Sequence, residues 1–178
     1  MMSEAEFLAG LTGSPIDLRS VVDALRAAGQ PFCLIGGLAV NHYTEPMVTL
    51  DADFAVVASH GIEDALRAVG FVVEVHPHSI NAQLPGSRLR IQITVNQRYG
   101  SFPSRAVNGE VFGVPLPVAS LDDLVQGKLW AATDPGRRST KRLKDRLDLL
   151  RLCEAHPRAI SLIPRHLIPE VDQLRTSL

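Results

Sequence analysis

The stretch Phe32–Val57 constrains the fold more than any other part of this chain. It reads FCLIGGLAVNHYTEPMVTLDADFAVV, in which a short apolar run ends in Gly36-Gly37 and a second apolar run carries Asp51 and Asp53. Residues two apart in a strand share one face of the sheet, so both carboxylates point the same way. Two acids on one strand face, opposite a glycine turn, predict a place where a divalent cation and a phosphate chain can bind.

These acids and glycines also have a plainer interpretation. Carboxylates in an apolar strand are costly to bury unless a cation or hydrogen-bond donors compensate them, which favours a Mg²⁺ site that also holds nucleotide phosphates. A strand end at the surface, where water solvates the acids, and an ordinary tight turn at Gly36-Gly37 explain the same residues. The glycines favour the first interpretation, because they let the backbone approach a phosphate closely and a helix with free N–H groups follows them.

Composition limits the class of protein. The chain has 178 residues, of which 46% are hydrophobic, so we expect a folded domain and not a disordered chain. The net charge of −1 predicts neither nucleic-acid nor membrane binding. However, eight of the 18 Lys and Arg lie between Lys128 and Arg151, against three acids in the same stretch. That patch either meets phosphates or forms a solvated helix face.

The cysteines and the N-terminal sequence indicate the compartment. Cys33 and Cys153 both lie beside apolar residues, which predicts two buried thiols in a reducing cytosol. No apolar stretch approaches the length of a membrane span, and the start, MMSEAEFLAG, has acids where a signal peptide has bases. We therefore expect a cytoplasmic protein with no membrane partner.

Hydrophobic periodicity predicts a core followed by a helical end. The predicted strands are Phe32–Ile35, Leu50–Val57, Phe71–Val75 and Arg88–Val95. The predicted helices run from Ser14-Pro15 to Gly29, from Gly37 to Tyr43, from Ser59 to Gly70, from Ser120 to about Ala132, and onward from about Ser139. We also predict a loop over His76–Ser87, a hairpin turn at Asn108-Gly109 and an extended connector at Pro115 and Pro117. This gives a core over 1–118 and a helical part over 119–178, with one single domain over 1–178 as the alternative.

Lys128 is the second candidate. Leu121, Leu124, Val125 and Ala132 form the apolar stripe of the helix that starts at Ser120, and Lys128 falls inside that stripe. A lysine in that position must extend to the surface, pair with an acid or meet an anion. Either a salt bridge that docks the helix or a phosphate contact explains it.

Asp145 and Asp148 share a face of the last long helix, three residues apart. Leu143, Leu147 and Leu150 lie on its opposite face. Because Lys141 lies on the same face as the acids, ordinary intrahelical pairing explains both of them without any catalytic role.

Gln92 lies on the polar side of Arg88–Val95. A site with two cations for phosphoryl transfer normally has a further carboxylate near the first two. Glutamine can orient a water but brings no charge. His76 and His78 share a loop with Pro77, and no third metal ligand lies beside them in the sequence, so we interpret them as surface residues.

Four segments in order resemble a known family. LIGGLAVNHY, TLDADFAVV, VASLDDLVQGKLWA and KRLKDRLDLLRL span most of Phe32–Leu152. Together they resemble the nucleotidyltransferase superfamily related to DNA polymerase beta, and within it the small toxin-type nucleotidyltransferases of abortive-infection and toxin–antitoxin systems. Many members have Gly-Ser where this chain has Gly36-Gly37.

The resemblance implies a fold and a site. The fold is α+β, a mixed β-sheet flanked by helices with a helical C-terminal part. An NTP is held by the turn at Gly36 and Gly37, and Mg²⁺ or Mn²⁺ by Asp51 and Asp53. Lys128 contacts the triphosphate and Asp145 is a further helix acid of the site. Gln92 occupies the position of the third acid, and a toxin role with a cognate antitoxin is implied for the whole protein.

We therefore hypothesise an enzyme that moves a nucleoside monophosphate from an NTP to a hydroxyl of RNA, protein or a small molecule. The basic stretch Arg137–Arg146 would hold an acceptor such as tRNA by its backbone. The alternative is a member of the same fold that binds nucleotide or RNA without catalysis, which Gln92 favours. A phosphatase that forms an aspartyl phosphate at Asp51 is disfavoured, because Phe32–Ile35 precedes the acids as an earlier strand. A sugar transferase is disfavoured by the chain length.

Overall fold

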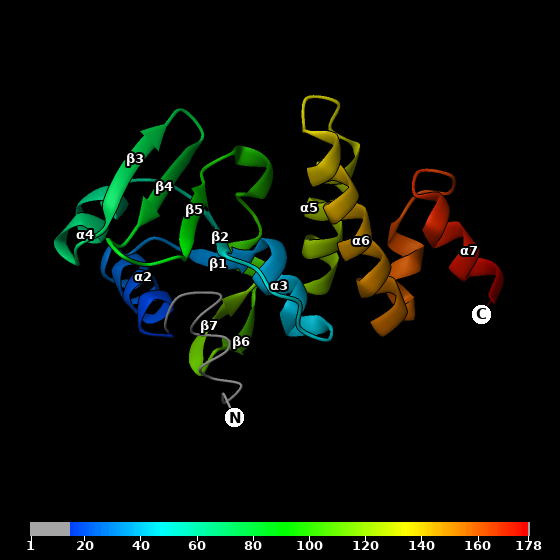
Figure 1. The fold of residues 1–178 in the computed structure, drawn as a ribbon, viewed down its shortest axis with the longest axis horizontal. Helices are drawn as coiled ribbons and strands as arrows, with labels where there is room; N and C mark the ends of the chain where they lie inside the picture. The colour runs from blue at the N-terminus through cyan, green and yellow to red at the C-terminus, as the bar shows by residue number, and fades with distance from the viewer. Residues whose placement is uncertain (1–14, 178) are drawn as a thin grey trace.

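A mixed seven-stranded sheet forms the centre of the molecule in a computed structural model, which describes residues 15–177 (Figure 1). The strand order is β3-β4-β5-β2-β1-β7-β6. The strands are β1 Phe32–Ile35, β2 Asp51–Val56, β3 Val72–His76, β4 Ser79–Gln83, β5 Arg90–Thr94, β6 Val107–Val111 and β7 Val114–Val118. The α+β class with a mixed sheet and flanking helices is confirmed.

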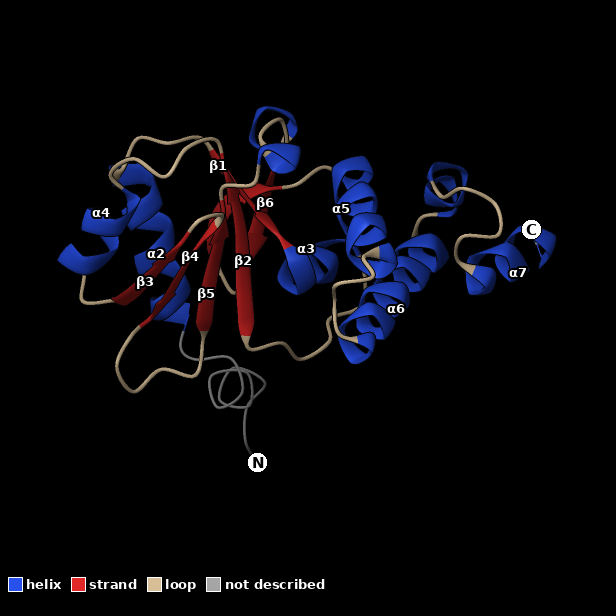
Figure 2. Ribbon diagram, turned by 90° about the horizontal axis from the view of Figure 1, so that it is seen from above, coloured by secondary structure: helices blue, strands red, loops and turns tan. Residues whose placement is uncertain are grey.

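Helices cover both faces of this sheet. They are α2 Pro15–Ala27, α3 Gly36–Tyr43, α4 Ile62–Ala68, α5 Leu121–Thr133, α6 Ser139–Ala155 and α7 Pro169–Ser177, with short 3₁₀ turns at Gln97–Tyr99, Pro103–Arg105 and Pro157–Leu162. Figure 2 shows α2 and α4 on one side of the strands and α3, α5 and α6 on the other, with α7 at the end of the molecule farthest from α4. The predicted helix boundaries at Ser120 and Ser139 are confirmed. Ser14, the predicted cap of α2, lies outside the described residues.

Three central strands position the candidate site. β1 pairs antiparallel with β2, and β2 pairs parallel with β5. The register sets Ile35 opposite Asp53 on one side of β2 and Gln92 opposite Asp53 on the other. Side chains alternate along β2, so Ala52 and Phe54 enter the core while Asp51 and Asp53 face the other way. The strand is therefore apolar on one face and acidic on the other, as the sequence predicts.

The segment His76–Ser87 is not one loop, as predicted, but contains β4. β4 pairs with β3 through a tight turn at Pro77-His78 and with β5 on its other side. Ile80 and Ala82 are the only buried residues of β4. Two apolar positions are too few to reveal the periodicity of a strand in the sequence. His76 and His78 lie at this turn.

The predicted hairpin turn at Asn108-Gly109 is wrong, because both residues lie inside β6. The chain turns instead at Phe112-Gly113, where both residues have positive φ (52° and 71°). Gly109 is needed for close packing, since a Cβ there would lie 2.6 Å from Val118 Cγ2. The predicted connector at Pro115 and Pro117 is strand β7. This strand pairs with β1 only through Val118, so the two prolines, which have no N–H to donate, interrupt no hydrogen bonds between β7 and β1.

The helical part packs on the rest through α3, which contacts both α5 and α6. The division into a core over 1–118 and a helical part over 119–178 stays a prediction. Cys33 and Cys153 are buried free thiols, as expected. No helix among the described residues is long and apolar enough to cross a membrane.

Candidate active site

The glycine turn lies directly against the carboxylate of Asp53. Gly36 has φ of +70°, and a Cβ added there would overlap the Asp53 side chain. Only glycine accepts this conformation without strain and also leaves room for the acid. The turn between β1 and α3 and the second acid of β2 therefore form one compact unit, with the first backbone N–H groups of α3 beside it.

Asp51 and Asp53 both line a cavity of about 910 Å³ between the sheet and α6. Asp51 accepts one hydrogen bond from Arg90 Nε, at 2.7 Å from Oδ1, and the Arg90 side chain remains 60% exposed. Asp53 has no ion pair among the described residues. The acids are thus neither splayed to opposite faces nor fully neutralised by arginines, and an open space adjoins them.

No direct ion pair within the described residues compensates the charge of Asp53. Burial raises the pKa of its carboxyl to about 6, against a lowering by Lys128 and a further rise from Asp51. A carboxylate that costs free energy to ionise is one that a cation stabilises. Mg²⁺ is commonly bound by one or two carboxylates together with substrate phosphates and water, so Asp51 and Asp53 fit it. No group of three or more His, Cys, Asp or Glu within residues 15–177 could hold a metal, so the remaining ligands would come from substrate and water.

Gln92 lies beside Asp53 on the neighbouring strand and faces the same cavity. Its amide has no hydrogen-bond partner among the described residues. The strand position that would carry a third acid therefore carries a neutral side chain with free donors and an acceptor.

Lys128 pairs with two acids of α6. Its Nζ lies 3.0 Å from Asp145 Oδ1 and 2.7 Å from Asp148 Oδ2, and all three side chains are almost fully buried. The two carboxylates raise the pKa of Lys128 against the opposing effect of burial. Of the possibilities that the sequence left open for this lysine, the structure shows pairing with acids.

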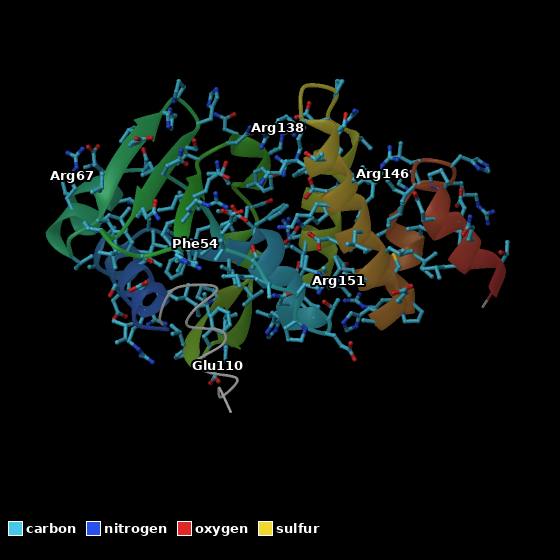
Figure 3. All side chains as sticks on the ribbon, viewed as in Figure 1. Phe54, Arg67, Glu110, Arg138, Arg146 and Arg151 are labelled. Carbon is cyan, nitrogen blue, oxygen red and sulfur yellow. The ribbon has the colours of Figure 1, made fainter. Side chains whose placement is uncertain are left out.

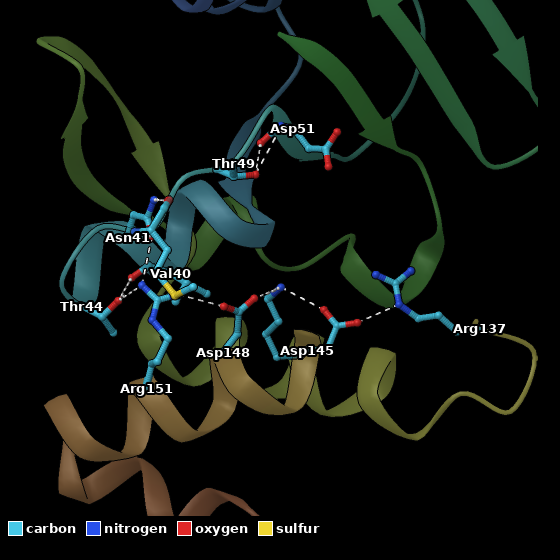
Figure 4. A network of polar contacts seen from close by, with 11 residues as sticks. Val40, Asn41, Thr44, Thr49, Asp51, Arg137, Asp145, Asp148 and Arg151 are labelled. Atoms are coloured by element: carbon cyan, nitrogen blue, oxygen red, sulfur yellow. Dashed lines mark hydrogen bonds and ion pairs between the residues drawn. The ribbon is translucent and has the colours of Figure 1, made fainter. Parts of the chain in front are cut away.

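The network continues on both sides of Lys128, as Figure 4 shows. Arg137 donates to Asp145 Oδ2 at 2.7 Å, and Arg151 donates to Asp148 Oδ1 at 2.9 Å. Arg151 also reaches the end of α3, where it bonds to Asn41, Thr44 and the carbonyl of Glu45. Cations and anions alternate, so the acids are held from both sides and α6 is tied to α3.

The expected pairing of Asp145 and Asp148 with Lys141 is wrong. Their partners are Lys128, Arg137 and Arg151, of which only Arg151 is a near neighbour in the same helix. Spacing within one helix could not show that Lys128 of α5 lies between the two acids. Leu143 and Leu147, on the opposite face, are 61% and 44% exposed.

A basic wall, which we define as Arg138, Lys141 and Lys144, lines the same cavity opposite the acids. None of the three side chains has a carboxylate partner in the part of the chain that the structure describes. Lys144 and Lys141 are close enough to Asp53 to act on it electrostatically, since both lower the pKa of its carboxyl. Figure 3 shows Arg138 at the upper end of α6, toward the strands. The cavity thus presents unpaired cations on one wall and carboxylates on the other.

A second, smaller cavity of about 220 Å³ adjoins the first. Both cavities share Asp53, Gln92, Lys128, Arg137 and Asp145. The smaller one is lined in addition by Ser79, Thr94, Tyr99 and Phe102.

Sequence reasoning missed Tyr99 and Phe102. Aromatic residues make up only 5% of the chain, and two of them stand three apart in a segment without periodicity. That scarcity is the one signal that singles them out.

Known structures share this architecture. No family model matches the chain, and no curated protein does. The crystal structure of ANT(2″)-Ia in complex with adenylyl-2″-tobramycin superposes with a TM-score of 0.59 and 16% identity, covering 91% of this chain and 97% of that one. The fold is that of the nucleotidyltransferases.

Two further structures agree with this assignment. The lincosamide antibiotic adenylyltransferase LnuA with lincomycin bound has a TM-score of 0.52 and 15% identity over 76% of this chain and 95% of that one. An antigenic nucleotidyltransferase-like protein from Paracoccidioides brasiliensis has a TM-score of 0.54 and 16% identity over 90% and 87%. Likeness at this level of identity shows the nucleotidyltransferase fold, while the toxin-type subclass stays a prediction.

Proposed function

We propose that this protein transfers a nucleoside monophosphate from an NTP to a hydroxyl group and releases pyrophosphate. The observation that carries the proposal is the open pair of carboxylates at Asp51 and Asp53. They lie beside the glycine turn at the centre of a nucleotidyltransferase fold and face a cavity with an unpaired basic wall.

The residues would divide the work by their charges. Asp51 and Asp53 would hold Mg²⁺ or Mn²⁺, which when bound offsets the negative charge of the phosphates. Gly36 and Gly37 present backbone N–H groups to the phosphate chain. The acceptor oxygen forms a bond to the α-phosphorus, the bond from that phosphorus to the bridging oxygen breaks, and pyrophosphate leaves with the electron pair. The hydroxyl proton passes to water in the cavity.

The basic wall is the first source of positive charge for the leaving pyrophosphate. Lys141 and Lys144 can bind a phosphate without breaking an ion pair among the described residues, whereas Lys128 already pairs with Asp145 and Asp148. We retain Lys128 and Asp145 as proposed site residues, because both line the cavity. A phosphate contact of Lys128 requires that a phosphate oxygen replace one of its carboxylate partners. Developing charge on the pyrophosphate is what such cations stabilise.

A member of the fold that binds nucleotide without transferring it is the second candidate. The neutral Gln92 beside Asp53 favours it, because no third carboxylate is present there to polarise an attacking hydroxyl. Binding of an NTP in calorimetry, with no Mg²⁺-dependent turnover on any acceptor, would support this candidate. The toxin role, the cognate antitoxin and a tRNA acceptor held along Arg137–Arg146 are also proposals, and they rest on the family resemblance and on the basic wall.

Transfer of label from NTPs tests the enzyme proposal. The protein is incubated with Mg²⁺ and each NTP labelled at the α-phosphorus, with small molecules, tRNA and the protein itself as acceptors. Asp51→Ala combined with Asp53→Ala should lower the rate at least about 10³-fold, because the charge that organises the phosphates is lost. Asp64→Ala removes an exposed aspartate of α4 and should change nothing. Unchanged transfer in the double variant would rule the assignment out.

A further inference from the structure

Among residues 15–177, Arg90 is the one cation that forms an ion pair with the open carboxylates Asp51 and Asp53. Its Nε donates to Asp51 Oδ1 at 2.7 Å. In the β2–β5 register Arg90 stands opposite Asp51, and its backbone N–H donates to the carbonyl oxygen of Leu50 at 2.8 Å. The backbone of Arg90 is therefore fixed beside the acid, whichever way its side chain turns.

The position of Arg90 matches a need of the two acids. Asp51 and Asp53 lie two apart on one face of β2, so their negative charges repel each other. A guanidinium bound to Asp51 offsets part of this repulsion while no metal ion is bound. Arg90 thus stands where the positive charge of a metal ion is needed.

This ion pair is held more loosely than the buried network beside it. The side chains of Arg90 and Asp51 are 60% and 26% exposed, whereas those of Lys128 and Asp145 are 9% and 3% exposed. An ion pair that is open to water contributes little to stability, because water solvates both partners and the long side chain loses freedom. Arg90 can therefore leave Asp51 at a small cost in free energy, which Lys128 and Asp145 cannot do.

The rest of the Arg90 guanidinium is available to a ligand. Only its Nε bonds to a residue that the structure describes, so the two terminal nitrogens, Nη1 and Nη2, have no partner there. In Arg151, by comparison, the terminal nitrogens bond to Asp148, Asn41 and Thr44. Arg90 lines the larger cavity together with the basic wall. Two free nitrogens on a planar guanidinium suit the oxygens of a phosphate.

Arg90 and a divalent cation compete for Asp51. A cation with two charges attracts the carboxylate more strongly than one guanidinium does, and it repels a guanidinium on the same carboxylate. Asp51 therefore favours the metal ion over Arg90. The phosphates of an NTP offer Arg90 another anionic partner in the cavity that it already lines.

We propose that Arg90 is a further nucleotide-binding residue, which pairs with Asp51 before substrate binds and shifts to a phosphate of the NTP when Asp51 binds the metal ion. The inference rests on the proposed nucleotidyl transfer. No covalent bond changes in this exchange: the hydrogen bond from Nε to Asp51 Oδ1 is replaced by hydrogen bonds from the guanidinium to phosphate oxygens. The exchange makes metal and NTP binding mutually supportive, because each removes the competitor of the other.

Arg90→Met tests both halves of the exchange, because it removes the guanidinium and introduces a thioether that Mn²⁺ does not favour as a ligand. Mn²⁺ alone should bind to the variant about threefold more tightly than to the wild type, since its competitor at Asp51 is gone. Inorganic triphosphate, the part common to all NTPs, should bind about tenfold more weakly with excess Mg²⁺ present. Calorimetry measures both constants. The two effects have opposite signs, whereas a merely structural loss weakens both.

Two matched variants separate the exchange from the effect of charge alone. Lys144→Met removes a cation of the same cavity that has no carboxylate partner in the described part of the chain, so its gain in Mn²⁺ affinity should be smaller than that of Arg90→Met. Arg67→Met removes an exposed arginine that pairs with Glu63 at 2.8 Å on α4, on the other side of the sheet, and should alter neither constant. If Arg90→Met fails to fold by circular dichroism, Arg90→Gln should show the same two signs.

The outcomes separate this inference from the function on which it rests. Weaker Mn²⁺ binding in Arg90→Met would mean that Arg90 orients Asp51 for the metal ion, and it would overturn the exchange. Triphosphate that binds equally well to the variant and the wild type, or an equal gain in Mn²⁺ affinity in Lys144→Met, would also overturn it. Each of these results leaves nucleotidyl transfer intact. A wild type that binds neither Mn²⁺ nor triphosphate would overturn the proposed function and the exchange together.

Discussion

Two pairs of aspartates, of which Asp51, Asp53 and Asp145 line the larger cavity, are neutralised in different ways. Asp145 and Asp148 on α6 are 2% exposed, and each is held by Lys128 and by an arginine. Asp51 and Asp53 on β2 have one arginine between them, bound to Asp51, and burial raises the pKa of Asp53 to about 6.

The contrast separates a structural role from a binding role. Asp145 and Asp148 are paired with cations of the chain itself, so they hold α5, α6 and α3 together and need no ligand to neutralise them. A partly buried carboxylate without an ion-pair partner, such as Asp53, costs free energy when ionised unless something outside the chain compensates it. A feature of this kind is typical of functional sites.

The largest effect on folding should come from breaking the compensated pair. Asp148→Ala leaves Lys128 and Arg151 each without one carboxylate in a buried position, and we expect a loss of about 3 kcal/mol in the free energy of unfolding. Urea denaturation measures it. Asp51→Ala is the matched comparison, with an expected loss under about 1 kcal/mol, since Arg90 is largely exposed. Equal losses of unfolding free energy in the two variants would show that the two pairs of aspartates do not differ in their contribution to stability.

The next effect has the opposite sign and depends on pH. The carboxyl pKa of Asp53 is raised from 3.8 to about 6, so the folded protein binds a proton more tightly there than the unfolded chain does. That contribution is fully present below pH 4 and is lost as pH rises through 6. In EDTA, Asp53→Asn should therefore be more stable than the wild type at pH 7 by on the order of 2 kcal/mol, and equal to it near pH 4.

Thermal unfolding across pH 4–8 measures this difference. Asp64→Asn serves as the control, because Asp64 is exposed on α4 and its substitution should leave the pH profile unchanged. Parallel curves for the wild type and Asp53→Asn would mean that Asp53 is compensated after all, and the comparison of the two pairs would fail.

The same contrast explains how much of this molecule the sequence could predict. The central strands, the glycine turn and the helices from Ser120 and Ser139 follow from local periodicity and capping, which act over a few residues. Asp51 and Asp53 are recognisable because residues two apart in one strand share a face.

What could not be predicted depends on contacts between distant segments. The pairing of Lys128 with Asp145 and Asp148 joins two helices, and no spacing within either helix reveals it. β4 is stabilised by β3 and β5 on its two sides more than by its own residues. Gly109 looked like a turn residue, but His42 and Val118 pack against its backbone and require it inside a strand.

The smallest effect tests the neutral neighbour of the open pair. Gln92→Glu sets a third carboxylate beside Asp53 in the β2–β5 register, where it adds a metal ligand and further like charge. We expect Mn²⁺ to bind about tenfold more tightly at pH 7, which corresponds to about 1.4 kcal/mol, as measured by calorimetry or electron paramagnetic resonance.

Asn81→Asp is the matched control for this change. Asn81 is the register partner of Gln92 on β4 and lines the same cavity, so the substitution adds one negative charge one strand farther from Asp53. Charge alone attracts Mn²⁺ in both variants, but only the carboxylate introduced by Gln92→Glu lies beside Asp53, so the gain in that variant should exceed the gain in Asn81→Asp several-fold. Equal gains would mean that Mn²⁺ senses the charge of the whole cavity and that the open pair on β2 is not its binding site.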